Sequence, residues 1–379
     1  MIKIDNVILF SRFLFSILKI LIITFILILI IDFFFGQKIL KKFDYFFSKS
    51  QFYERIIRVD HPVYHHTLRK NINYSNNVGF TGKYKLCSNN HGFKSKCGQL
   101  DGKNYAFAFI GDSFTEGTPI EYEDSFVGMF EKETGYKTAN LGIVSYSPKI
   151  YLSKINFLLK EGFKFNHVVV FIDISDFYDD TNFYTINKNF IVSEKNSKKK
   201  NLKRKKFLRK NFPLTNFWMF VVKKYKFKDE NVNKVENNGL PIFLDKVNLK
   251  GKWTYSKLDK IEGYDFGIEK GHKIMVDHMT QLYNILNKKG IKMSLAVYPW
   301  PHQLQHDLQN SLHVAIWKKF CDGKCENFIN YFPIFFQDMN NSSYLQTYKK
   351  FYFKNDPHFN KKGHKVLAKE LIEIFYKHE

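Results

Sequence analysis

The sequence of 379 residues lacks the patterns that mark the common repeat, cofactor and metal classes. It contains no internal repeat, which excludes a solenoid or propeller built from repeated units. It also contains no Gly-rich dinucleotide loop and no convincing cluster of metal-ligating side chains. We therefore expect neither a cofactor nor a metal ion.

Acidic residues are scarce beside basic ones, because 36 Asp and Glu stand against 59 Lys and Arg and give a formal net charge of +23. Such a charge suits nucleic acid, an anionic membrane surface or an acidic polysaccharide as a partner. Lysine is abundant together with Asn, Ile and Phe, so we attribute most of the charge to compositional bias. Hydrophobic residues make up 44% of the chain, which is enough for a sizeable core.

Cysteine is rare, with only Cys87, Cys97, Cys321 and Cys325 in the whole chain. The four form two pairs that are close in sequence, which favours the disulfides Cys87–Cys97 and Cys321–Cys325 in an oxidising compartment. A four-cysteine zinc site is one alternative, although paired zinc ligands usually lie about two to four residues apart and only the second pair fits. Reduced, buried cysteines are the other alternative.

One long hydrophobic run extends from Leu14 to Phe35, with Lys19 near its start and Asp32 near its end. About 20 apolar residues span the hydrocarbon core of a bilayer. The run is longer than the hydrophobic part of a signal peptide, and no small-x-small cleavage site follows it. We therefore expect an uncleaved signal anchor, a transmembrane helix within residues 1–36; a buried core helix is the alternative.

Basic residues flank this run on both sides in equal number, so the positive-inside rule hardly selects an orientation. They are Lys3, Arg12, Lys19, Lys38, Lys41 and Lys42. The anchor and the cysteine pairs together favour a single-pass membrane protein whose main domain is extracytoplasmic, in the periplasm or at the cell surface.

Strands and helices alternate in an expected domain at residues 104–379, which follows a juxtamembrane region at residues 37–103. The expected strands cover Tyr105–Ile110, Thr138–Leu141, His167–Ile174 and Ile291–Tyr298. The expected helices cover Ser125–Thr134, Ile150–Glu161, Gly271–Lys289 and Lys361–Tyr376. Alternation of this kind predicts an α/β domain with a mostly parallel sheet.

An insertion at about residues 181–263 interrupts the alternation. It contains a basic run from Lys198 to Lys210 and an aromatic run around Phe217, Trp218 and Phe220. A charge run is usually a solvated loop. The alternative is a basic, aromatic flap close to the membrane surface or over the active site.

Residues Gly111–Gly117 read Gly-Asp-Ser-Phe-Thr-Glu-Gly and stand between a buried strand and a helix. Ligands of an open α/β sheet bind where strands end and helices begin. A serine there presents its hydroxyl, and nearby backbone N–H groups face the negative charge that develops on an attacked carbonyl. Ser113 is therefore the expected nucleophile.

Asp356-Pro357-His358 precedes the last helix and supplies the base that Ser113 needs. In an extended loop, His358 takes the serine proton while Asp356 holds the imidazole tautomer. Asn360 would cap the helix without engaging His358. His364 is a rival base, which we rank second because it lies within the expected helix.

The two motifs resemble those of the SGNH (GDSL) hydrolase superfamily. Asn90–Lys94 resembles the Asn-x-Gly-Phe-Arg stretch that precedes the nucleophile there, and Asn140-Leu141-Gly142 resembles the second sequence block. The resemblance implies a doubly wound, flavodoxin-like three-layer fold with no cofactor. It also implies an oxyanion hole formed by the N–H groups of Ser113 and Gly142.

Two positions depart from the family pattern. Ser175 stands where the third block has Asn, and its shorter hydroxyl would have to complete the oxyanion hole; losing one such donor typically costs about 10²–10³ in rate. Asp-x-His replaces the more frequent Asp-x-x-His spacing, and is similar to the alginate O-acetylation branch of membrane-linked proteins.

The expected function is a serine-dependent esterase that acts on an acylated glycan or lipid of the cell envelope. An O-acyltransferase of an exported polysaccharide is one alternative, since water and a sugar hydroxyl compete for the same acyl-enzyme. A non-catalytic carbohydrate-binding or scaffold protein of an envelope-modification complex is another. Trp300 is suited either to stacking on a sugar ring or to the core. Nucleic acid is not an expected partner outside the cytoplasm.

Overall fold

The computed structural model describes residues 2–42, 57–79, 82–195, 207–208, 211–216, 218–219, 252–254, 267–354 and 356–376. The chain forms two compact units, which are described separately. One consists of Met1–Lys49 and Asn196–Asn233, and the other of Ser50–Lys195 and Lys234–Glu379.

The larger unit is built on a five-stranded sheet in which every strand pair is parallel. Its strands are β5 (Asn104–Ile110), β6 (Thr138–Asn140), β7 (Lys164–Ile172), β10 (Lys292–Val297) and β11 (Phe328–Asn330). The spatial order β11-β10-β7-β5-β6 is the flavodoxin-like order, in which the strand order reverses between the first strand, β5, and the third, β7. The predicted parallel α/β sheet is confirmed, and its switch point lies between β5 and β7.

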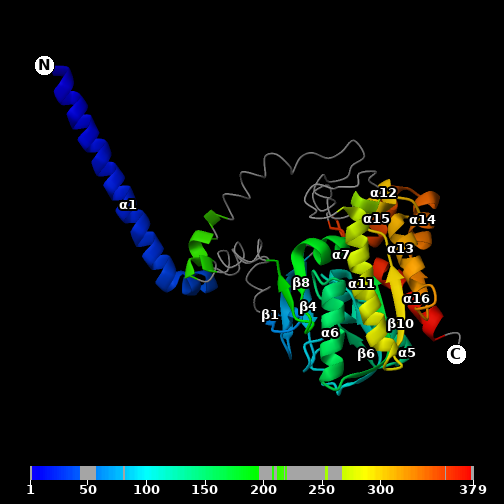
Figure 1. The fold of residues 1–379 in the computed structure, drawn as a ribbon. Coiled ribbons are helices and arrows are strands. Elements are labelled where there is room, and N and C mark those ends of the chain that lie inside the picture. The colour runs from blue at the N-terminus through cyan, green and yellow to red at the C-terminus, as the bar shows by residue number, and fades with distance from the viewer. Residues whose placement is uncertain are drawn as a thin grey trace. The chain divides into compact units, whose positions relative to one another are not determined.

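Helices pack on both faces of this sheet (Figure 1). On one side α6 (Pro148–Lys160) packs against α11 (Ile268–Asn287), and on the other α5 (Phe126–Thr134) packs against α16 (Lys361–Phe375). The core strands are buried almost throughout, as expected for a sheet covered on both faces. Shorter helices complete the unit: α4 (Ser113–Glu116), η1 (Tyr122–Asp124), α7 (Ile174–Tyr178), α12 (Pro301–His306), α13 (Leu312–Cys321), α14 (Phe332–Asn341) and α15 (Tyr344–Phe351).

The expected strand at His167–Ile174 ends earlier in the structure, at Ile172. Asp173 stops it, because the Asp173 carboxylate caps the N-terminus of α7 by accepting the N–H groups of Ser175 and Asp176. Ile174 is therefore helical, although its side chain continues the apolar pattern of the strand.

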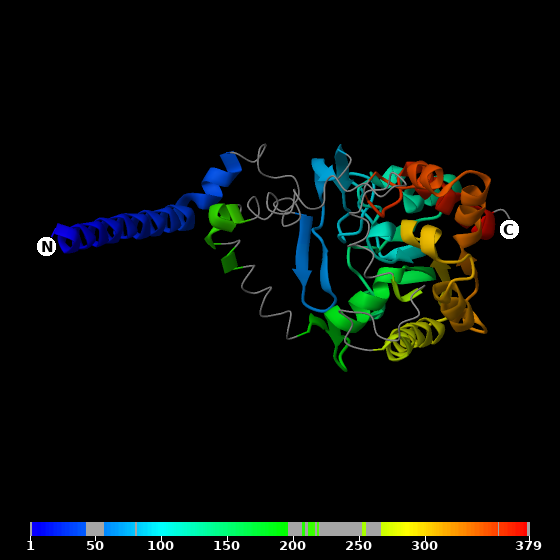
Figure 2. The ribbon, with the colours of Figure 1, turned by 90° about the horizontal axis from the view of Figure 1, so that it is seen from above.

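Residues 57–103 differ from the expected juxtamembrane region, because they belong to the larger compact unit. Two antiparallel hairpins form here, β1 (Arg58–His61) with β2 (His65–Leu68), and β3 (Asn73–Gly79) with β4 (Gly82–Cys87). In Figures 1 and 2 these hairpins (blue) lie on the opposite side of the domain from α14 and α16 (orange and red). Their apolar side chains join the main core, and each fully buried one contributes roughly 1.5–3 kcal/mol.

Part of the expected insertion is also folded into the larger unit. A π-helix (η2, Asp179–Phe183) leads into the hairpin β8 (Tyr184–Ile186) with β9 (Val192–Glu194). A short 3₁₀-helix (η4, Lys252–Thr254) buries Trp253, whose indole N–H donates to the carbonyl of Ile174. The basic run lies outside the described residues apart from residues 207–208.

The smaller unit contains α1 (Ile2–Lys42), with an apolar stretch at Arg12–Gly36. Among the described residues, this is the one helix long and apolar enough to cross a membrane. Asp32 near its end is buried, and its two carboxylate oxygens accept the N–H groups of Leu214 (2.8 Å) and Thr215 (2.7 Å). The acidic residue of the apolar run thus has backbone partners.

Candidate active site

Ser113 begins α4, directly after β5 and at the switch point of the sheet. Asp112 caps this short helix by accepting the N–H of Phe114 at 2.9 Å. Gly111 is required before it, because a Cβ there would lie 2.8 Å from the carbonyl oxygen of Phe171 on the neighbouring strand. Gly117, with φ +75°, ends the helix in the left-handed conformation that glycine adopts readily. The turn therefore presents Ser113 at a fixed place above the sheet.

The structure brings Ser113, His358 and Asp356 together across 245 residues of sequence. His358 Nε2 lies 2.7 Å from Ser113 Oγ, and His358 Nδ1 lies 2.5 Å from Asp356 Oδ1. Because a carboxylate only accepts, Nδ1 carries the proton and Nε2 is free to take one from Ser113. Asp356 Oδ1 also accepts the backbone N–H of His358 at 2.8 Å, which fixes the loop. This arrangement is suited to nucleophilic attack by Ser113.

A buried cluster of three acids lies beneath the nucleophile and was not predicted from the sequence. Burial and the negative charge of Asp173 raise the pKa of Asp112 well above its usual value. Burial, again with the charge of Asp173, raises the pKa of Asp176 in the same direction. Asp112 Oδ2 lies 3.1 Å from Ser113 Oγ. Because a protonated Asp112 competes less than a carboxylate for the Ser113 proton, this raised pKa favours the transfer of that proton to His358.

Ser175 stands beside this cluster, and its hydroxyl already has an acceptor. Ser175 Oγ donates to Asp173 Oδ1 at 2.8 Å, and its N–H donates to the same oxygen at 2.7 Å. The hydroxyl would have to turn away from Asp173 to complete an oxyanion hole, so this role stays a prediction.

The N–H of Gly142 also has a partner within the protein. It donates to Asn140 Oδ1 at 3.1 Å, while the amide of Asn140 donates to the carbonyl of Thr115 at 2.9 Å. A substrate oxygen would have to displace Asn140 to bind there. By contrast, within the described part of the chain the N–H groups of Ser113 and Ser145 have no acceptor. No sequence pattern indicated Ser145, which is exposed and has an unusual φ of 61°.

Trp300 is buried rather than presented to solvent, with 5% of its surface exposed. Its indole N–H donates to Asp173 Oδ2 at 3.0 Å, and its ring lies 5.6 Å from that of Phe114. The structure thus places Trp300 in the core, next to Phe114 and Asp173. Stacking on a sugar stays a prediction.

His364, the rival base, lies away from the nucleophile. Its Nδ1 accepts the N–H of Phe126 at 3.3 Å, and its ring stacks on that of Phe126. Burial, with the positive charge of Lys94, lowers the pKa of His364 to about 3. Its place is structural, since it joins α16 to α5.

Both cysteine pairs are bridged, Cys87 to Cys97 and Cys321 to Cys325. The first links β4 to the loop before β5, and the second closes the end of α13. Among the described residues, no group of three or more His, Cys, Asp or Glu side chains is arranged to hold a metal ion.

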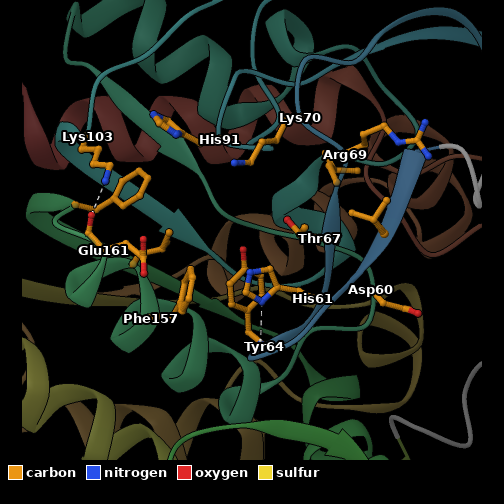
Figure 3. A pocket seen from close by; sticks show the side chains of 14 residues that line it. Asp60, His61, Tyr64, Thr67, Arg69, Lys70, His91, Lys103, Phe157 and Glu161 are labelled. Atoms are coloured by element: carbon orange, nitrogen blue, oxygen red, sulfur yellow. Dashed lines mark hydrogen bonds between the residues drawn. The ribbon is translucent and has the colours of Figure 1, made fainter.

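A cavity of about 530 Å³ is lined by residues of the hairpin β1–β2 and of α6, among others (Figure 3). Its walls include aromatic rings of Tyr64 and Phe157 and the cationic side chains of Lys70 and Lys103. None of the residues that line it belongs to the triad, so it forms no part of the Ser113 site.

No family model matches the chain, and no curated protein matches it. Three solved structures to which it is similar are a member of the lipolytic protein G-D-S-L family from Veillonella parvula DSM 2008, a psychrotrophic esterase from Pseudoalteromonas sp., and an acetylxylan esterase (a catalytic mutant) from Geobacillus stearothermophilus. Each is 10% identical, and they cover 71%, 73% and 72% of this chain and 97%, 98% and 94% of their own. The TM-scores are 0.38, 0.35 and 0.37. With scores below 0.5 these likenesses are weak, and the function proposed below rests on the arrangement of Ser113, His358 and Asp356.

Proposed function

We propose that this protein is a serine-dependent acyl-ester hydrolase. One observation carries the proposal: an unbroken line of hydrogen bonds from Asp356 through His358 to the hydroxyl of Ser113. The nucleophile stands at the switch point of a parallel sheet, where ligands of such folds bind. A structural role alone does not require a serine, a histidine and a carboxylate in this order.

The reaction follows from the proton positions. Ser113 Oγ attacks the acyl carbonyl carbon while its proton passes to His358 Nε2, and the new imidazolium is stabilised by Asp356. The tetrahedral intermediate collapses when His358 returns that proton to the departing alkoxide, which leaves as an alcohol. Water then attacks the acyl-enzyme, again with His358 as base, and Ser113 is released together with a carboxylic acid.

The substrate proposed is an acylated glycan or lipid of a cell envelope. Support comes from α1, whose apolar stretch of 25 residues is long enough to span a bilayer, and from the two disulfides, which suit an oxidising compartment. The enzyme would act outside the cytoplasm as a single-pass membrane protein.

The test is hydrolysis of p-nitrophenyl acetate by the detergent-solubilised full chain. We expect Ser113→Ala and His358→Ala to reduce kcat/KM to the background rate, at least about 10³-fold, without lowering the melting temperature. His364→Gln is the matched control, because a Gln oxygen can still accept the N–H of Phe126; it should retain activity. Full activity in either triad variant would refute the proposal, and acyl transfer to an added sugar in preference to water would identify a transferase.

A further inference from the structure

Among the described residues, the peptide between Val144 and Ser145 has a hydrogen-bond partner for its oxygen but none for its nitrogen. The carbonyl of Val144 accepts from His66 Nε2 at 2.8 Å. The N–H of the same amide belongs to Ser145, and among the described residues it has no acceptor. The neighbouring polar atoms are engaged, since Val144 N–H donates to Glu116 Oε2 at 2.8 Å and Ser145 O accepts from Tyr184 at 2.9 Å. One N–H is therefore left for a substrate oxygen.

This turn lies beside the nucleophile. Ile143 N–H donates to the carbonyl of Gly111 at 3.3 Å, and Val144 N–H reaches Glu116. Gly111 and Glu116 stand on either side of Ser113 in the sequence. Contacts at both ends of the nucleophile turn hold Ile143 and Val144 against it, and Ser145 follows them directly in the chain.

The hairpin β1–β2 holds the turn from the other side. Arg58 binds both carboxylate oxygens of Glu116, at 2.8 and 2.9 Å, and its charge lowers the pKa of Glu116 against the effect of burial. The hydroxyl of Tyr146 donates to the backbone carbonyl of His66. The hairpin therefore contacts the turn through Arg58 by way of Glu116, and through His66 directly.

The proton positions in this region form a directed chain. A carbonyl only accepts, so His66 Nε2 carries a proton and donates it to Val144. Burial, together with the charge of His65, lowers the pKa of His66 to about 3, so His66 is neutral and its Nδ1 accepts. His65 Nδ1 lies 2.7 Å from that Nδ1, and His65 Nε2 lies 3.2 Å from Glu194 Oε1. His65 Nδ1 therefore donates to His66 Nδ1, and the other ring nitrogen of His65 faces the Glu194 carboxylate.

We propose that His66 is a positioning residue for the oxyanion hole. It holds and polarises the Val144–Ser145 peptide, so that the N–H of Ser145 binds the oxyanion. The inference rests on the proposed function. Hydrogen bonds in a chain strengthen one another, so a donor on the amide oxygen makes the amide N–H a better donor. Glu194 and His65 fix the tautomer of His66, much as a carboxylate does for a catalytic histidine.

The test compares His66→Leu, which removes the donor, with His66→Gln, whose amide can still donate to Val144, in the detergent-solubilised full chain. Removing an oxyanion-hole donor costs about 10²–10³ in kcat, and a donor that is present but poorly positioned costs less. We therefore expect His66→Leu to lower kcat roughly 10- to 100-fold, with KM within about twofold of the wild-type value. His66→Gln should recover most of the loss. Glu194→Gln should lower kcat roughly two- to tenfold, the range of one hydrogen bond.

His61→Leu is the matched control. His61 lies in the same hairpin and its Nδ1 accepts the N–H groups of Val63 and Tyr64, away from the turn. The His61→Leu substitution should leave kcat unchanged. If His66 had only a structural role, the apparent kcat of His66→Leu and of His66→Gln would fall through loss of folded protein. A lower melting temperature would reveal that loss.

A second measurement judges the inference without any turnover. Amide hydrogen exchange, followed by mass spectrometry over residues 142–147, should be faster in His66→Leu than in the wild type and in His61→Leu. Unchanged exchange there would overturn the inference, as would wild-type kcat in His66→Leu when Ser113→Ala is inactive. Activity in Ser113→Ala would instead overturn the proposed function while leaving the exchange result to decide on His66.

Discussion

Lys154 allows a test of how much the burial of one charged side chain costs the folded state. It lies on α6 with no exposed surface, and its ammonium donates to the carbonyl of Leu141 at 2.9 Å. Three aromatic rings surround the ammonium at 4.9–5.6 Å, those of Tyr146, Tyr64 and Phe93. No carboxylate is paired with it among the described residues. Burial lowers the pKa of Lys154 from 10.5 to about 7, although the charge of Glu116 acts in the opposite direction.

The magnitude follows from that pKa. A difference of about 3.5 units at 1.36 kcal/mol per unit means that keeping Lys154 charged in the fold costs about 5 kcal/mol. Because the folded pKa lies below the unfolded one, the unfolded chain binds one more proton between about pH 7 and pH 10.5. The wild type therefore gains about 1.4 kcal/mol of stability per pH unit as the pH rises through this window.

Replacement of Lys154 by Met removes the charge and keeps an unbranched side chain. After about 2 kcal/mol is subtracted for the lost hydrogen bond and cation–π contacts, Lys154→Met should be more stable than the wild type by roughly 3 kcal/mol at pH 6. The advantage should shrink as the pH rises and vanish by about pH 9. The gain would come from removing a buried charge that a well-packed apolar residue can replace.

The assay is urea unfolding of the full chain in detergent at pH 6, 7, 8 and 9, followed by tryptophan fluorescence. Lys160→Met is the control, because Lys160 is an exposed lysine on the same helix. The free energy of unfolding of Lys160→Met should change with pH in the same way as that of the wild type. Parallel curves for Lys154→Met, or a lower stability at every pH, would refute the reasoning.

Two further predictions concern the triad and the disulfides. Asp356→Asn should lower kcat by about 10⁴, because the amide favours the wrong tautomer of His358. The loss should be smaller at alkaline pH, where hydroxide partly replaces the base. Activity near that of the wild type at neutral pH would mean that another carboxylate orients His358, and Asp176 would be the first to test. Peptide mapping of the unreduced membrane protein should recover Cys87 joined to Cys97 and Cys321 joined to Cys325, whereas four free thiols would argue for a cytoplasmic domain and reverse the expected topology.

Strands β5, β7 and β10 of the central sheet were predictable because they are buried on both faces and are therefore largely continuous apolar runs. The run Val168–Ile172 is an example. Strand β11 (Phe328–Asn330) is only three residues long and was not predicted. The proximity of Ser113 and His358 was expected for a different reason: each stands close to a helix start, in a motif typical of a nucleophile or a base. The structure places these two residues within hydrogen-bonding distance, and their catalytic roles stay a prediction.

The hairpins β1–β2 and β3–β4 and the turn at residues 143–145 were not predictable by the same means. Strand β1 reads Arg-Val-Asp-His and β2 reads His-His-Thr-Leu, so neither has the alternation of apolar residues that marks a half-buried strand. Their burial comes from long-range polar pairs such as Arg58 with Glu116 and His66 with Val144, which leave no periodic trace. Ser145 gave no signal either, because its left-handed backbone is imposed by these contacts rather than by its residue type.

Covalent labelling tests the central claim most directly. The full chain, solubilised in detergent, is treated with a fluorophosphonate, digested and analysed by mass spectrometry. We expect one modified peptide, with the phosphonyl group on Ser113, and its loss in Ser113→Ala together with a strong reduction in His358→Ala. An unlabelled wild type, or labelling that persists in Ser113→Ala, would contradict the account.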